Sequence, residues 1–134
     1  MKRRWFAVLC GAVAAFALAA PALAHHSFAA EFDSDKPVTV KGVITSVRLE
    51  NPHSWFFLDV AGTDGKVEKW AFEASTPSSL IRSGFKPGTV KAGDEVTIKG
   101  YHARDAAANA GAARELQMAD GRAFAIGPAV GPQR

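Results

Sequence analysis

Short runs of β-branched and aromatic residues, separated by turn residues, recur along the chain between residues 38 and 127. Runs of this kind are typical of the strands of small all-β folds. We expect strands over residues 38–49, 54–61, 66–73 and 95–101, followed by a hairpin over residues 113–127. The chain should therefore fold around one core built from strands.

Glycines in this pattern indicate where the backbone turns or bends. Asp64-Gly65 and Asp120-Gly121 are expected to form tight hairpin turns, because an Asp-Gly pair tolerates the positive φ angles that such turns need. Within residues 38–49 the apolar alternation changes phase at Gly42. A glycine at such a change predicts a β-bulge and a sharply bent first strand.

Residues 75–84 carry the start and stop signals of one short helix. Ser75 or Thr76 is the expected N-cap, Pro77 follows it, and Gly84 ends the segment. The order is then three strands, a helix, and two or three further strands. This order predicts an all-β fold with one short helix, a small OB-like Greek-key β-barrel. An open β-sandwich is the alternative.

The chain begins with the three-part pattern of a secretory signal peptide. Three basic residues lie within the first four, an apolar run covers residues 5–20, and the small-residue triplet Ala22-Leu23-Ala24 follows. This layout predicts cleavage after Ala24 and a periplasmic or secreted bacterial protein with no membrane anchor after processing. A membrane anchor is the alternative, but the apolar run is short for one. The general secretory route is preferred to the twin-arginine route.

The predicted domain organisation follows from these boundaries. The signal peptide covers residues 1–24 and an N-terminal arm covers residues 25–37. The OB-like barrel covers residues 38–127 and a flexible tail covers residues 128–134. Within the barrel, residues 103–113 contain no bulky apolar side chain, so we expect a mobile loop there.

Charge and cysteine content exclude some functions. The whole chain has a net charge of +3, but the signal peptide carries three basic and no acidic residues, so the processed chain is neutral. A nucleic-acid-binding domain is expected to keep a basic patch, and we therefore expect no nucleic-acid partner. The single cysteine, Cys10, lies in the signal peptide, so the processed chain has neither a disulfide nor a thiolate ligand.

Several motifs together resemble a family of short, secreted bacterial proteins that is described only as a domain of unknown function. The segments are HHSF after the signal peptide, NPH with a tryptophan two positions on, and WAFE. The resemblance implies a periplasmic or secreted β-barrel-like domain and supplies no activity. The motif residues are His25, His26, Phe28, Asn51, Pro52, His53, Trp55, Trp70 and Glu73.

The histidines suggest a metal site. Cleavage after Ala24 would leave His25 as the first residue, whose imidazole and α-amine can both bind one metal ion. His53 is the better candidate for a second imidazole, and His26 could assist locally. A planar set of nitrogen ligands favours copper, and another divalent metal is the alternative. The alternative for His25 and His26 is that they are merely exposed polar residues, and His53 could instead pin a turn by a hydrogen bond.

A metal-free alternative uses the surface of the barrel. Asn51, Trp55, Trp70 and His102 could form a binding face for a periplasmic protein or an oligosaccharide, since OB-like barrels use aromatic side chains and two loops in this way. The opposing interpretation is that the aromatic side chains mostly fill the core. We see no catalytic residues with recognisable spacing, and we therefore expect a binding protein rather than an enzyme.

Overall fold

The computed structural model describes residues 27–128. The chain divides into two units, Met1–Glu31 and Phe32–Arg134. The first contains the short helix α2, and the second contains six strands and the helix α3. The bounds are α2 Ser27–Glu31, β1 Phe32–Arg48, β2 Ser54–Ala61, β3 Val67–Ala74, α3 Pro77–Arg82, β4 Glu95–Ala103, β5 Ala110–Met118 and β6 Ala123–Ala125. The fold is therefore all-β, and the described residues hold two short helices where one was expected.

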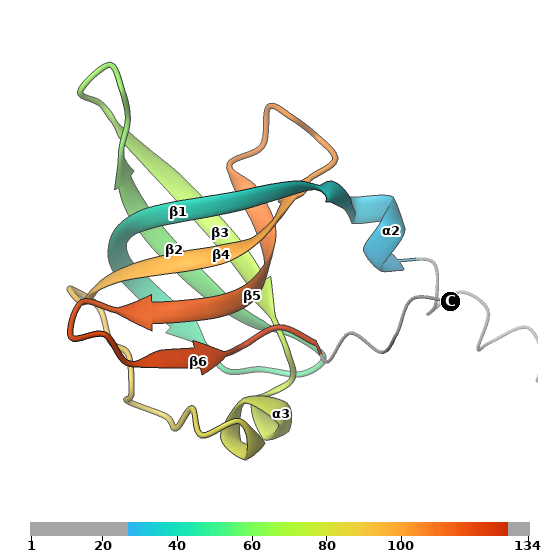
Figure 1. Ribbon diagram of the computed structural model, residues 1–134, viewed down its shortest axis with the longest axis vertical. Coiled ribbons are helices and arrows are strands. Elements are labelled where there is room, and N and C mark those ends of the chain that lie inside the picture. Colours follow the sequence, from blue (N-terminus) through green and yellow to red (C-terminus); the bar gives the residue numbers. More distant parts are fainter. Residues whose placement is uncertain (1–26, 129–134) are drawn as a thin grey trace, which may run out of the picture. The chain divides into compact units, whose positions relative to one another are not determined.

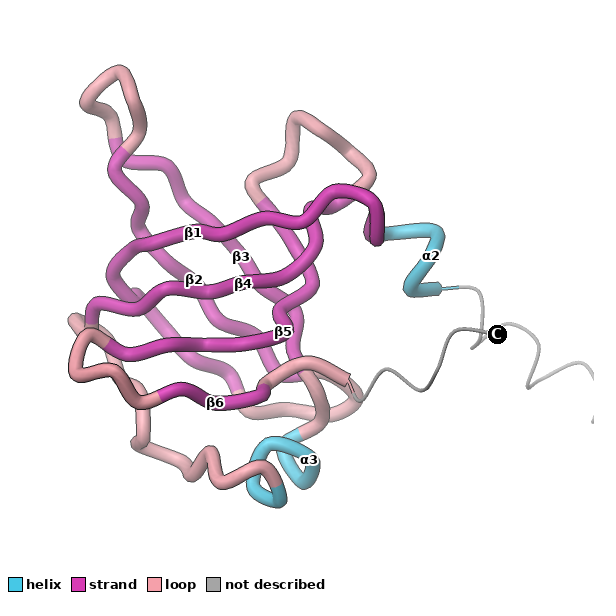
Figure 2. The backbone as a smooth tube through the Cα atoms, in the orientation of Figure 1, coloured by secondary structure: helices cyan, strands magenta, loops and turns pink. Residues whose placement is uncertain are grey.

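The strands of the second unit form a closed ring in the order β1, β2, β3, β5, β4 (Figures 1 and 2). β1 links two sides of the ring because it pairs with both β2 and β4. The pairings are antiparallel except that of β3 with β5, which is parallel and runs from Ala71 opposite Ala110 to Glu73 opposite Ala112. β6 pairs with β5. This topology confirms the predicted OB-like Greek-key barrel.

The core lies inside the ring and takes alternate residues from each strand. On β2, Phe56 and Leu58 are buried, whereas Trp55, directly before Phe56, is only half-buried. On β4, Val96 and Ile98 are buried. Successive side chains of a strand point to opposite faces, so every half-buried residue between two core residues lies on the outer surface of the barrel.

Helix α3 lies between β3 and β4 in the chain and contributes to the same core. Thr76 is its N-cap, with its hydroxyl oxygen accepting from the backbone N–H of Ser79 at 3.3 Å, and Pro77 is the first residue. Leu80 of the helix and Phe85 just after it are both 1 % exposed and belong to the main hydrophobic cluster. The predicted helix and its start signals are thus confirmed.

Strand β1 begins earlier than expected, at Phe32, and its bulge lies further along. The register between β1 and β2 shifts between Ile44 and Ser46, so the prediction of a bulge is confirmed but its position at Gly42 is wrong. Gly42 instead lets two strands approach each other. A Cβ atom there would lie 2.6 Å from the carbonyl oxygen of Asp59.

The predicted mobile loop over residues 103–113 is wrong in its last part, because β5 begins at Ala110. Ala113 is fully buried. A Cβ atom on Gly111 would lie 2.6 Å from the carbonyl oxygen of Tyr101, so a larger residue does not fit there. Small side chains are needed where β3, β4 and β5 meet, and their lack of bulk does not indicate a loop.

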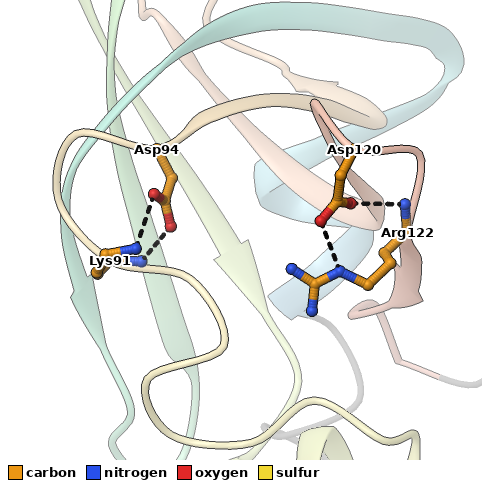
Figure 3. A network of polar contacts seen from close by, with 4 residues as sticks. All are labelled: Lys91, Asp94, Asp120 and Arg122. Carbon is orange, nitrogen blue, oxygen red and sulfur yellow. Dashed lines mark hydrogen bonds and ion pairs between the residues drawn. The ribbon is translucent and has the colours of Figure 1, made fainter.

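Two turns near the ends of β4 and β5 are held by aspartates (Figure 3). Asp94 accepts from the backbone N–H of Lys91 at 3.0 Å and from its ammonium group at 3.1 Å. Asp120 accepts from the backbone N–H of Arg122 at 3.0 Å and from its Nε at 2.8 Å. Both kinds of hydrogen bond lower the pKa of the two carboxyl groups below the usual value, and the backbone hydrogen bonds have the larger effect. Gly121 has a φ of +91°, as the predicted Asp-Gly turn requires.

Several sequence predictions fall on residues that the structure does not describe. The signal peptide over residues 1–24, the histidines His25 and His26, and nearly all of the tail over residues 128–134 lie outside the described range. Within the described range, neither helix has the length and the apolar character that crossing a membrane requires.

Candidate binding face

Two aromatic rings lie together on the outer surface of β2. Trp55 and Phe57 are half-buried, their ring centroids are 6.3 Å apart and their planes differ by 21°. The guanidinium carbon of Arg48, from β1, lies 5.1 Å from the centroid of the Phe57 ring, within the range of a cation–π interaction. A hollow of about 200 Å³ lies beside Phe57, and Asp59 and Lys69 are among the residues that line it. The Lys69 ammonium group donates to Oδ1 of Asp59 at 3.1 Å.

A histidine–carboxylate pair borders these rings. Glu73 lies directly opposite Trp55 in the β2–β3 register, and its Oε1 lies 3.0 Å from Nδ1 of His53. The His53 side chain is 51 % exposed and that of Glu73 only 15 %. His53 follows the cis Asn51–Pro52 peptide in the β1–β2 loop, where Asn51 is exposed. We call the surface formed by Arg48, His53, Trp55, Phe57 and Glu73 the Trp55 face.

The loop between β4 and β5 reaches the same side of the barrel. The backbone N–H of Ala71, on β3, donates to the carbonyl oxygen of Asn109 in that loop at 3.1 Å. Glu73 pairs with Ala112 just beyond it. The face of β2 and β3 is thus flanked by the β1–β2 loop and the β4–β5 loop, which is the arrangement that OB-type barrels use to bind ligands.

Two of the predicted binding residues, Trp70 and His102, contact each other on the core side of the sheet, although Trp70 also lines the hollow beside Phe57. The Trp70 ring stacks with that of Phe72 at a centroid distance of 5.7 Å and packs against the main core. It meets the His102 ring edge-on at 5.6 Å. Nδ1 of His102 donates to the carbonyl oxygen of Ala103 at 2.7 Å. Trp70 and His102 therefore form a second aromatic contact, on the core side of the sheet.

The predicted metal ligands are only partly described. His53 lies on the Trp55 face, whereas His25 and His26 are outside the described residues. Within residues 27–128, no group of three or more metal-binding side chains is placed so that it could hold an ion. The described residues thus provide one exposed imidazole whose other ring nitrogen is held by a carboxylate, an arrangement that commonly orients metal-ligating histidines.

Comparison with protein families gives one match. The model described as "Family of unknown function (DUF6152)" matches residues 12–113. The chain belongs to this family. No curated protein matches the chain, and no solved structure does. Membership of the family confirms the resemblance carried by the HHSF, NPH and WAFE segments.

For this family member, sequence reasoning alone did not single out Arg48. The residue lies opposite Trp55 only because the bulge after Ile44 shifts the second half of β1 by one residue. Without the bulge, the alternation along β1 would turn residue 48 to the core side, like Val40 and Ile44. The signal in the sequence was the alternation of Val47 and Leu49, whose parity differs from that of Val38 and Val40.

Proposed function

We propose that the barrel is a binding module whose Trp55 face takes up a ligand, and that its role is binding rather than catalysis. The observation that carries this proposal is the placement of the stacked Trp55 and Phe57 rings. They lie on the outer surface of β2, between the two loops that flank the ligand face of OB-type barrels. The signal-peptide pattern of residues 1–24 supports a periplasmic or secreted location.

The chemistry of the face fits an oligosaccharide. The Trp55 and Phe57 rings, whose planes differ by only 21°, together offer apolar surface against which the apolar face of a sugar ring can pack. Around the two rings lie a guanidinium group, an imidazole and a carboxylate, from Arg48, His53 and Glu73. These groups donate and accept hydrogen bonds, as the hydroxyl groups of a sugar require.

The test is binding of chitohexaose, cellohexaose and maltohexaose to Trp55→Ala. We expect the variant to lose about tenfold or more in affinity for any member of this panel that the unaltered chain binds, because it removes the large apolar surface of the indole ring from the contact. The matched control is Val67→Ala, which shortens an apolar side chain that is 64 % exposed at the start of β3. Equal losses in both variants would contradict the proposal. Capture of a protein by the Trp55 face in place of a sugar would assign the same face to a protein partner.

A second candidate function is copper binding, and the geometry of His53 favours it. Nδ1 of His53 faces Oε1 of Glu73 at 3.0 Å, which leaves the other ring nitrogen, Nε2, for a metal ion, and the side chain is half-exposed. The proposed site combines that nitrogen with the α-amine and imidazole of His25, assisted by His26.

Electron paramagnetic resonance of a Cu(II) titration tests this candidate. A chain that begins at His25 should give a nitrogen-rich axial signal, and a chain with one added leading residue should not. His53→Ala should weaken Cu(II) binding, whereas His102→Ala should not. Identical binding by all four proteins would exclude the site.

A further inference from the structure

A second hollow lies away from the Trp55 face, between α3 and the β5–β6 region. It has a volume of about 420 Å³, and Figure 1 shows α3 lying next to β6. Its polar lining consists of two arginines and three serines: Ser75, Ser79, Arg82, Ser83 and Arg114. Among the described residues no carboxylate lines it, so its lining carries positive charge.

Arg114 reaches this hollow because of an irregularity in β5. Lys99 of β4 pairs with Glu115, whereas the next residue, Gly100, pairs with Ala113, so Arg114 is the extra residue of a bulge. A bulge redirects the side chain of its extra residue. The carbonyl oxygen of Arg114 accepts from the backbone N–H groups of Ile126 and Gly127 at 3.0 and 3.2 Å, which holds the bulge in place.

Gly127 also leaves room for the Arg114 side chain. A Cβ atom on Gly127 would lie 3.1 Å from Cδ of Arg114 and 2.9 Å from its Cα. The side chain is half-buried, and no carboxylate of the described residues forms an ion pair with it. A half-buried guanidinium group without a carboxylate partner favours the binding of an anion.

The second arginine is held on the opposite wall by α3. Nη2 of Arg82 donates to Oγ of Ser79 at 3.0 Å. Because Ser79 accepts this bond, its own hydroxyl proton can be donated to a ligand. Ser83 has a structural role, since its Oγ contacts the carbonyl oxygens of Leu80 and Ala125, each at 2.8 Å. These contacts tie the end of α3 to β6 and fix the width of the hollow.

We propose that this hollow binds an oxyanion, such as a phosphate, sulfate or carboxylate group. Arg114 and Arg82 bind it from two sides, and the hydroxyl groups of Ser75 and Ser79 donate to it. Planar guanidinium groups bind such oxygens through paired hydrogen bonds. The site is independent of the proposed function, because none of its residues belongs to the Trp55 face.

The test is a titration of the ¹⁵N-labelled full chain with inorganic phosphate and with sulfate, followed by nuclear magnetic resonance. We expect saturable shifts of the Ser75, Ser79 and Gly127 amide signals. Arg114→Gln and Arg82→Gln should each weaken phosphate binding by about tenfold or more, because each removes a hydrogen bond to a charged group. Arg82 is exposed, so its variant remains informative if Arg114→Gln is less stable.

The matched control is Lys66→Gln, which removes one positive charge from the β2–β3 turn, at the opposite end of the barrel from α3 in Figure 1. This control should bind phosphate as the unaltered chain does. A parallel measurement with phosphatidylglycerol and phosphatidylcholine vesicles identifies the source of the anion. Binding of free phosphate alone indicates a soluble ligand, and Arg114-dependent binding of the anionic vesicles indicates a lipid headgroup. Equal phosphate affinity in all variants, or no binding of either probe, would overturn the proposal.

Discussion

At the scale of single residues, Ser54 is one of two polar residues, with Ser75, that are buried among the described residues. It is fully buried at the start of β2, and its Oγ has no hydrogen-bond partner among the described residues. Its backbone is satisfied, because the N–H of Ser54 donates to the carbonyl oxygen of Ser75 at 3.1 Å. Removing a hydroxyl group from water costs free energy, and without a hydrogen-bond partner in the folded protein this cost is not offset.

Ser54→Ala is therefore expected to raise the free energy of unfolding by about 1 kcal/mol. Urea denaturation followed by tryptophan fluorescence measures this change. Ser46→Ala is a matched control, because Ser46 is exposed on β1, and it should leave the free energy of unfolding nearly unchanged. A clear loss of stability in Ser54→Ala would show that the hydroxyl group has a partner that stabilises the fold.

Residue patterns in the sequence were informative where a strand is regular. In β2 the buried Phe56 and Leu58 alternate with the half-buried Trp55 and Phe57, and this alternation in the sequence marks the two faces of the strand. It did not reveal that Trp70 lies on the core side with His102. Two tryptophans on neighbouring strands share a face only if the register brings them together, and the register is set by the turn and by packing.

At the scale of elements, β5 shows how close strand contacts select small residues. A Cβ atom on Gly100 would clash with the backbone carbonyl of Ala112, and one on Gly111 with that of Tyr101. These contacts lie where β5 joins β3 to β4 and closes the ring. Small residues in this segment are thus needed for the ring of strands to close.

Gly100→Ala should lower the free energy of unfolding by about 1–3 kcal/mol, because the added methyl group meets backbone that cannot easily move. Thermal and urea denaturation test this expectation. Ala107→Val adds methyl groups in the exposed β4–β5 loop and should cost much less. Similar stability of the two variants would contradict the account of ring closure.

Most elements could be predicted because their signals are local. β2, β3, α3 and the Asp-Gly turns follow from residues that are neighbours in the sequence. The position of the bulge in β1 and the start of β5 were not predicted, because both are set by the pairing of each strand with its neighbours in the sheet. Gly42 was read as a bulge residue, whereas its lack of a side chain serves the close approach of Asp59.

At the scale of the whole barrel, the candidate binding face exists because the ring closes. The parallel pairing of β3 with β5 brings the β4–β5 loop to the side of β3 that carries Glu73. The β1–β2 loop brings His53 to the same carboxylate at 3.0 Å. The OB-like topology was predicted from the order of elements, but this convergence of residues came only with the structure.

The central claim is that ligand binds at the Trp55 face, and the most direct measurement is a nuclear magnetic resonance titration of the unaltered chain with the three oligosaccharides. The account predicts that binding shifts the indole N–H signal of Trp55 and the signals of His53 and Glu73. The indole N–H of Trp70, on the core side of the sheet, should stay in place. Shifts confined to Trp70 and His102, or no shift with any of the three sugars, would contradict the account.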